Sequence, residues 1–204
     1  MSVFDLNDQN RDLDYKIVAG LERLSQVFRV LLWEQAKEHG LSPIQIQLLI
    51  FIRYHSPDKT TVSYLAGEFQ VTKPTVSDAV KVLEQKKLVK KVSDKADARS
   101  YSTRLTAKGA QMVRETERFT DPLLHMLAGE KDSDKQALWT TISRFIGMLG
   151  KAGVISIQRS CYHCRYYRLE QQQPYCGLLE QVLLPPDIRL DCPEFEVTDS
   201  NAPA

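Results

Sequence analysis

The stretch TKPTVSDAVKVLEQKKLVKKV, residues 72–92, combines a capped helix with the start of a basic strand. Thr72 is a residue type that caps helices, and Pro74 fits the first helical turn because it needs no hydrogen-bond donor there. Apolar residues at 76, 79, 80 and 83 repeat at helical spacing. The stretch therefore predicts a helix that buries one face, followed by a β-strand over Leu88–Val92.

The flanking residues extend this pattern. A short apolar helix is predicted to begin at Thr60 or Thr61, and a brief turn at 70–71 separates it from the second helix. Residues 93–100 are polar and lack periodicity, whereas residues 101–105 alternate as a returning strand does. Two helices joined by a tight turn and followed by a β-hairpin predict a winged helix-turn-helix.

Positive charge is concentrated in this region. Residues 72–108 contain ten Lys and Arg against four Asp and Glu, whereas the rest of the chain has 17 basic and 22 acidic residues. A basic block in an acidic chain is typical of a site for a polyanion, although a charge run alone is more often a solvated surface.

Duplex DNA suits the predicted winged helix. The second helix can enter the major groove, where small polar side chains meet base edges, and lysines there and on the hairpin can contact phosphates or the minor groove. The predicted contact residues are Thr72, Lys73, Thr75, Ser77, Asp78, Lys81, Lys91, Lys95 and Arg99. Each alone is compatible with plain surface, and their joint occurrence favours DNA. A winged-helix adaptor that binds protein is the alternative from another class.

Long helices are predicted on both sides of the winged helix. Apolar residues at 13, 17, 21, 24, 28 and 31 form one face of a helix that ends at Gly40. Residues 138, 142, 145 and 149 form a stripe on a final helix that starts at Ser133 or Asp134. These stripes are wider than one helix partner needs, which is consistent with a dimer.

All four cysteines lie in the last 44 residues, as Cys161-x2-Cys164-x11-Cys176-x15-Cys192. A Cys-x2-Cys turn points two thiolates the same way, and two further cysteines complete a four-sulfur shell for zinc or an iron–sulfur cluster. Unligated buried thiols and a redox disulfide switch are the alternatives. We therefore expect Cys161, Cys164, Cys176 and Cys192 to ligate a metal or cofactor.

The choice between zinc and a cluster rests on finer features. Zinc ribbons usually pair two Cys-x2-Cys turns, and the second is missing here. Pro193 follows the last cysteine, as in many cluster motifs, and tyrosines and leucines nearby could shield a cluster. These features favour [4Fe–4S], with zinc as the alternative. His163, between the first two cysteines, is expected to be solvated.

Several segments resemble the MarR family. Residues 41–49, LSPIQIQLL, are similar to the family's second helix, and residues 75–77 with 83–89, TVS and LEQKKLV, resemble its recognition helix and exit into the wing. Asp94, Asp97-Ala98-Arg99 and residues 105–109 resemble its wing and following helix. The likeness covers roughly residues 10–155. Lys87 departs from it, because the family usually has glycine there, so we expect a less sharp turn.

The resemblance implies a homodimer that binds a palindromic operator in double-stranded DNA, with recognition helices about 34–36 Å apart. It implies that Asp97 orients Arg99 for the minor groove. It also implies a transcriptional repressor that releases DNA when a small-molecule effector or an oxidant changes the spacing of the helices. The four-cysteine site adds redox- or metal-responsive control; a small-molecule-responsive regulator with a structural zinc clip is the alternative.

The chain as a whole is expected to be mainly α-helical with a small β-hairpin wing. We predict a dimerisation helix at 1–40, the winged helix-turn-helix at 41–108, dimerisation helices at 109–158, a four-cysteine module at 159–197 and a disordered tail at 198–204. No phosphate-binding loop or nucleophile elbow occurs, so we expect no enzyme. The longest apolar run is Leu48–Ile52 and the first residues are acidic, so we expect a cytoplasmic protein without membrane contact.

Overall fold

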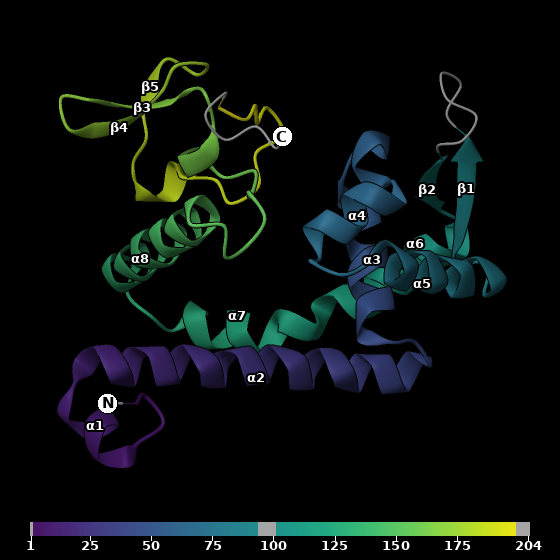
Figure 1. Cartoon of the computed structure of the whole chain (residues 1–204), viewed down its shortest axis with the longest axis horizontal. Coiled ribbons are helices and arrows are strands. Elements are labelled where there is room, and N and C mark those ends of the chain that lie inside the picture. The colour runs from purple at the N-terminus through teal and green to yellow at the C-terminus, as the bar shows by residue number, and fades with distance from the viewer. Residues whose placement is uncertain (1, 94–100, 199–204) are drawn as a thin grey trace. The chain divides into compact units, whose positions relative to one another are not determined.

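A computed structural model describes residues 2–93 and 101–198 of the 204-residue chain (Figure 1). The chain divides into two compact units, Met1–Leu124 and His125–Ala204. The architecture is mainly helical, with a two-stranded hairpin in the first unit and a small three-stranded sheet in the second. No helix within the described ranges is both long and apolar enough to cross a membrane.

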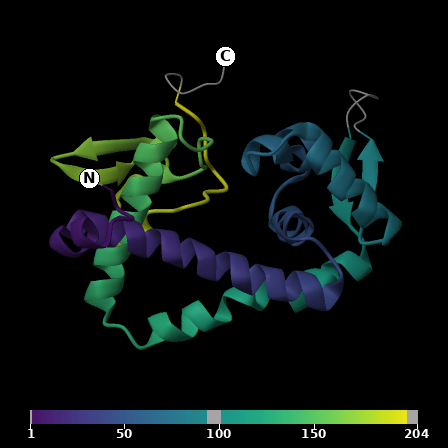
Figure 2. The same ribbon diagram turned by 60° about the horizontal axis from the view of Figure 1, so that its bottom comes forward.

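The first unit begins with two helices, α1 (Leu6–Arg11) and the long α2 (Leu13–His39), shown in purple in Figure 2. Asp12 caps α2 by accepting a hydrogen bond from the backbone N–H of Asp14. Gly40 ends it in the left-handed region at φ 61°, a conformation in which glycine avoids the steric cost of a side chain. The predicted end of the first long helix is therefore confirmed.

Three helices and a short 3₁₀ turn follow: α3 (Pro43–Tyr54), η1 (Pro57–Thr60), α4 (Val62–Glu68) and α5 (Lys73–Gln85). Each α-helix starts at a hydroxyl cap. Ser42 and Gln45 form a reciprocal capping box, Thr61 accepts from the N–H of Tyr64, and Thr72 accepts from the N–H of Thr75. These caps place the helix-turn-helix where the sequence predicts it.

The wing consists of β1 (Val89–Ser93) and β2 (Tyr101–Leu105), paired antiparallel with Val89 opposite Leu105. Thr106 then caps α6 (Ala107–Thr116), and η2 (Glu117–Thr120) leads into α7 (Asp121–Ala128), which carries Pro122 in its first turn. Ser93, predicted as the first residue of the loop at 93–100, belongs to β1; residues 94–100 of that loop and residues 199–204 of the predicted tail lie outside the described residues.

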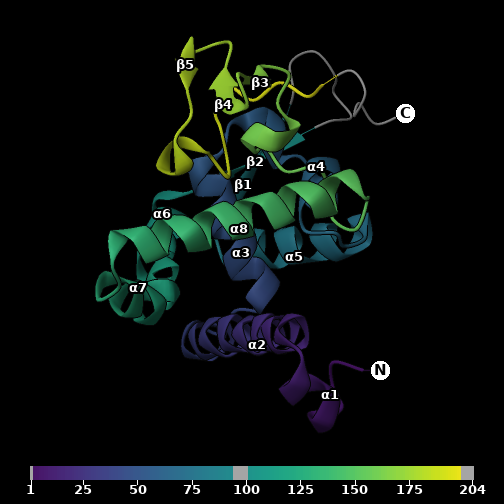
Figure 3. The same cartoon turned by 90° about the vertical axis from the view of Figure 1, so that its left-hand side faces the viewer.

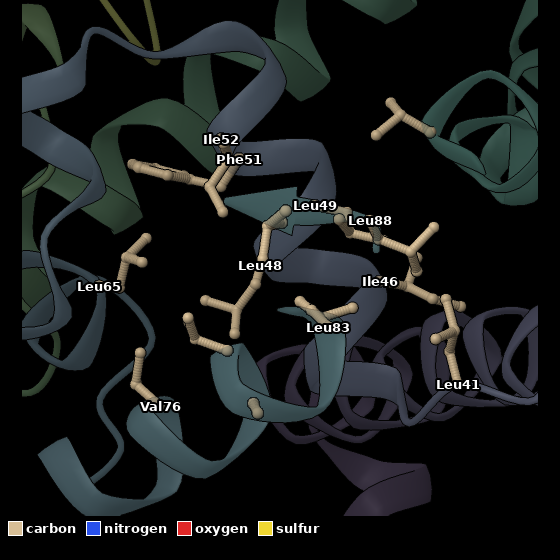
Figure 4. Close-up of a cluster of buried hydrophobic side chains, with 14 of the residues drawn as sticks. Leu41, Ile46, Leu48, Leu49, Phe51, Ile52, Leu65, Val76, Leu83 and Leu88 are labelled. Carbon is tan, nitrogen blue, oxygen red and sulfur yellow. The ribbon is translucent and has the colours of Figure 1, made fainter. Parts of the chain in front are cut away.

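The core of the first unit lies between α2, α3, α4, α5, α6 and β1 (Figure 4). Ile46, Leu48, Leu49, Leu65 and Leu83 are fully buried there. Because this core holds the inner face of α5, it fixes which side chains that helix presents to solvent.

The second unit contains α8 (Asp132–Lys151) and the cysteine module, residues 159–197 (Figure 3). α8 begins one residue before the earlier of the two predicted starts. The module has two short 3₁₀ turns, η3 (Cys161–His163) and η4 (Pro185–Asp187), both in contact with α8. Its strands β3 (Tyr167–Glu170), β4 (Gln173–Cys176) and β5 (Gln181–Val182) form an antiparallel sheet in the order β3-β4-β5.

Candidate nucleic-acid interface and cysteine site

Helix α5 has one buried and one exposed face. Val76 and Val80 are fully buried, and Ala79 and Leu83 complete the inner face. The predicted DNA-contacting residues of this helix and its cap are all exposed: Thr72, Lys73, Thr75, Ser77, Asp78 and Lys81. The exposed side chains of α5 are thus polar and lie mainly near its N-terminus. The free N–H groups at this end of a helix favour the binding of an anion.

The two threonines at the start of α5 are joined to each other. The hydroxyl oxygens of Thr72 and Thr75 lie 2.8 Å apart, and the Thr72 oxygen also accepts from the Thr75 N–H at 3.2 Å. Thr72 therefore serves mainly as the helix cap. Thr75 remains exposed with its hydroxyl orientation constrained by its neighbour.

Lys91 of the wing is bound to α5. Its ammonium lies 3.0 Å from the Glu84 carboxylate and 5.1 Å from the centre of the Tyr101 ring. The hydrogen bond to Glu84 raises the pKa of Lys91. The sequence predicts Lys91 as a phosphate contact, but part of its charge is compensated within the protein. Lys95, Asp97 and Arg99 lie outside the described residues.

The turn between α5 and β1 is sharp despite the absence of glycine. Lys87 adopts φ 60°. Its N–H donates to the carbonyl of Glu84, and the N–H of Leu88 donates to the carbonyl of Leu83, the hydrogen-bond pair of a glycine-type helix end. The expectation that Lys87 would make the turn less sharp is wrong, because these two bonds and the burial of Leu88 impose the left-handed conformation.

The four cysteines surround one cavity of about 30 Å³. Cys161 opens η3, Cys164 follows it, Cys176 ends β4 and Cys192 lies in the loop after η4. Leucines and tyrosines complete much of the wall: Leu178, Leu179, Leu183, Tyr166 and Tyr167. A cavity needs roughly 10–15 Å³ to hold one water molecule, so this cavity is large enough for a ligand of more than one atom. None of the four is in a disulfide.

Arg189 and Glu194 lie at one edge of this cavity. The backbone N–H of Arg189 lies 3.2 Å from the Cys161 sulfur, and its guanidinium lies 3.4 Å from the Cys192 sulfur and 2.9 Å from Glu194. Burial raises the pKa of the Cys161 thiol, and the other three cysteines add to that shift, whereas the Arg189 N–H opposes it. A positive ligand would reverse this balance by favouring the thiolates.

A second layer of polar contacts holds the module together. The guanidinium of Arg159, 5% exposed, makes two bonds to Asp191 at 2.6 and 2.9 Å. The carbonyl of Arg159 accepts from the N–H of Cys192, and the N–H of Cys161 donates to the carbonyl of Arg189. These bonds bring the last cysteine next to the first two.

His163 is fully buried, so the expectation that it would be solvated is wrong. Its Nδ1 lies 3.1 Å from the Ser160 hydroxyl, and its Nε2 has no hydrogen-bond partner within 3.5 Å among the residues that the structure describes. Burial lowers the pKa of His163, which favours the neutral ring. The ring packs against Gly150 of α8 and does not line the cysteine cavity.

The donor set of the cavity fits a thiophilic metal or cluster, because four sulfurs face one enclosed, mainly apolar space. Over the described ranges, however, no three His, Cys, Asp or Glu side chains are arranged to hold a metal ion. The structure therefore brings the predicted ligands to one cavity without forming a closed ion shell.

Comparison with known proteins gives a local family match and a shared fold. A model of the MarR family matches residues 39–100. The S. aureus MepR–DNA complex is similar at 21% identity, with a TM-score of 0.57, over 65% of this chain and 97% of that chain. FabT of Streptococcus pneumoniae in complex with DNA is similar at 22% identity and TM-score 0.55, over 68% and 99%. The transcriptional regulator PA3341 is similar at 23% and 0.56, over 66% and 98%.

Identities of this size establish a shared fold, and no curated protein matches the sequence significantly. The expected fold, mainly helical with a β-hairpin wing, is confirmed. The MarR-family match covers residues 39–100, which include the helix-turn-helix and β1 of the wing, and the fold is similar to those of MepR, FabT and PA3341.

Proposed function

We propose that this chain is a homodimeric, sequence-specific DNA-binding regulator that represses transcription from a palindromic operator. The observation that carries this proposal is the division of α5 into a buried apolar face and an exposed polar one beside the wing. The DNA complexes of MepR and FabT support it, because these two proteins of similar fold bind DNA. Such a regulator would act in the cytoplasm.

The exposed residues of α5 match the two kinds of contact that a recognition helix makes. Thr75, Ser77 and Asp78 offer short donors and acceptors suited to base edges, and a carboxylate can accept from the amino group of cytosine. Lys73 and Lys81 offer charge to phosphates, which supplies affinity without sequence preference. Asp97 and Arg99 would extend the contact into the minor groove.

The exposed apolar side chains of α2 support the homodimer. Ile17, Leu21, Leu24 and Phe28 lie on one stripe and are each more than 40% exposed. The second unit offers Leu138, Phe145 and Leu149 on α8, each at least 39% exposed. Contiguous apolar surface of this kind marks an interface, and a second copy of the chain is the occupant that presents the same stripes in return.

Selection from a random duplex library, followed by binding titrations over a range of salt, tests DNA recognition. We expect an enriched inverted repeat and a steep loss of affinity with salt. Lys73→Ala and Lys81→Ala should each reduce the salt slope by about 1, whereas Thr75→Ala should change base preference. Lys135→Ala, on α8, is the matched charge control. No enriched sequence together with salt-independent binding would favour the protein-interaction adaptor.

We further propose that Cys161, Cys164, Cys176 and Cys192 hold a [4Fe–4S] cluster that makes the regulator redox- or metal-responsive. The four sulfurs line one cavity. Among the described residues, however, no three of them are arranged to hold a single metal ion. A cluster distributes its cysteine ligands over separate iron atoms, whereas zinc draws four sulfurs to within about 2.3 Å of one centre. The mainly apolar wall of the cavity, which can shield a cluster from water, favours a cluster.

Zinc is the alternative occupant, and it would make the module a structural clip. A small-molecule effector would then be the signal that releases DNA. Visible absorption with iron, sulfide and zinc analysis, on protein purified without oxygen, separates the two. A broad visible band with iron and sulfide supports the cluster, whereas a colourless protein with one zinc per chain supports the clip and overturns the cluster.

A further inference from the structure

Helix α8 has two distinct faces. The face toward the cysteine module consists of small and aliphatic residues, of which Ser143, Gly147 and Gly150 are buried. The other face leaves Leu138, Phe145, Met148 and Leu149 exposed, from 39% to 60%. The same helix thus contacts the module on one side and presents the proposed dimer surface on the other.

The two glycines of α8 make room for the residues between the first two cysteines. A Cβ atom at position 147 would lie 2.9 Å from Cβ of Tyr162, and one at position 150 would lie 2.6 Å from Nε2 of His163. Real Cβ atoms do not approach other heavy atoms this closely, so any residue larger than glycine must displace its neighbour. Tyr162 and His163 therefore occupy space that an ordinary helix fills with its own side chains.

The turn between the cysteines holds these side chains away from the cavity. The N–H of His163 donates to the Ser160 carbonyl, and that of Cys164 to the Cys161 carbonyl, which closes η3. Cys161 and Cys164 line the cavity, whereas Tyr162 packs on Gly147 and His163 on Gly150. Figure 1 shows η3 between α8 and the strands of the module. One short turn thus faces the cavity on one side and α8 on the other.

We infer that Tyr162 and His163 are positioning residues that transmit the state of the cysteine site to α8, and through its exposed face to the dimer interface. This inference rests on the proposed function. Ligation of both cysteines fixes the conformation of η3 and therefore seats both side chains against the glycines. Loss of ligation leaves this three-residue 3₁₀ turn held only by its hydrogen bonds and its packing, so it can shift, and close packing passes the change to the helix.

Hydrogen exchange on the full wild-type chain tests the contact directly. The protein is compared after reconstitution with iron and sulfide, after loading with Zn²⁺, and after removal of metal by a chelator. We expect the amides of residues 143–151 of α8 to lose protection when metal is removed, with those of α3 unchanged. Equal protection of α8 in loaded and stripped protein overturns the inference, and this measurement does not depend on DNA binding.

Operator affinity of loaded and stripped protein tests the consequence. We expect the wild-type ratio of the two dissociation constants to be about fivefold or more, a typical allosteric coupling. Gly150→Ala and His163→Ala should bring the ratio to about one while metal content and operator binding persist. Gly67→Ala is the matched control, because it adds the same methyl group to an exposed position of α4, where no atom beyond its chain neighbours and the helix's own backbone lies within 4 Å.

The outcomes separate the two proposals. A wild-type protein that binds no DNA overturns the proposed function. Hydrogen exchange in α8 then still shows whether the contact between η3 and α8 responds to ligation. A wild-type ratio of one, or variants that keep the wild-type ratio, overturns transmission while DNA binding stands. If Gly150→Ala loses its metal, the exchange of α8 in the wild-type protein decides whether the contact responds to ligation.

Discussion

The winged helix buries leucine, isoleucine and valine from several helices, whereas the cysteine module buries a different set of groups. Leu48, Leu49 and Leu83 are fully buried in the first region. The buried side chains of residues 159–197 are Arg159, Ser160, His163, Cys164, Leu183 and Ile188. Half of these are polar, and they are held by hydrogen bonds and one ion pair.

This difference shows that the two regions depend on different forces. Burial of apolar side chains, each contributing about 1.5–3 kcal/mol, can stabilise the winged helix without a ligand. A module of about 40 residues usually needs metals, disulfides or association to offset its conformational entropy. The cysteine cavity is the place where such a cross-link would act.

The largest expected effect comes from removing one cysteine. With the cysteines ligated as proposed, Cys164→Ser should release the ligand and lower the protection of residues 159–197 more than any other substitution considered, because ligation supplies free energy on the order of 10 kcal/mol in small metal modules. Hydrogen exchange and limited proteolysis should show loss of protection there and unchanged protection in the winged helix. A module that stays protected in this variant would show that its polar contacts suffice, and the contrast between the regions would fail.

A substitution in the apolar core tests how much burial stabilises the winged helix. Leu48→Ala should lower the free energy of unfolding of the first unit by about 2–5 kcal/mol, because Leu48 is fully buried and leaves a cavity. Chemical denaturation followed by circular dichroism measures the change. Leu178→Ala in the module, where the side chain is 44% exposed, is the matched control and should cost much less. Equal losses for the two variants would contradict the comparison.

Removal of the Arg159–Asp191 ion pair of the module should have an intermediate effect on stability. Arg159→Met should destabilise residues 159–197 by about 1–3 kcal/mol, less than for a fully buried pair because the Asp191 side chain is 42% exposed. Amide exchange in the module measures the loss. Arg165→Met removes a pair to Glu196 in which both partners are exposed, so it should change little. Similar losses in both variants would show that burial of Arg159 contributes nothing.

The smallest expected effect is a gain in stability. Lys87→Gly should raise the stability of the winged helix by about 1 kcal/mol, because glycine adopts a positive φ without the steric cost that lysine bears. The denaturation midpoint measures it. Gln85→Gly is the control: Gln85 is the exposed last residue of α5, so glycine there should destabilise. A loss of stability in Lys87→Gly would show that the lysine side chain stabilises the turn.

The sequence predicts the winged helix well because its signals are local. Ser42, Thr61 and Thr72 cap helices within three residues of themselves, and Gly40 ends α2 through its own conformation. The alternation of 101–105 likewise marks the returning strand. No distant residue is needed to interpret these patterns.

The errors occur where distant contacts decide the conformation. His163 is polar and lies between two cysteines, yet Gly147 and Gly150 of α8 create the space that buries this turn. The two glycines at a three-residue spacing are a signal, but nothing in the sequence pairs them with residues 162–163. Lys87 bends sharply because the burial of Leu88 requires it. Cysteine spacing predicts that four sulfurs gather but not how far apart they lie.

The bond between Lys86 and Gly40 gives α2 a mechanical role. The Lys86 ammonium donates to the Gly40 carbonyl at 2.9 Å, which links the C-terminal end of α5 to the C-terminal end of α2. A helix of 27 residues is about 40 Å long. A tilt of about 5° at its far end therefore moves the tied end by about 3.5 Å, close to the rise of one base pair. With the homodimer proposed above, a change of side-chain packing along α2 would therefore displace the C-terminal end of α5.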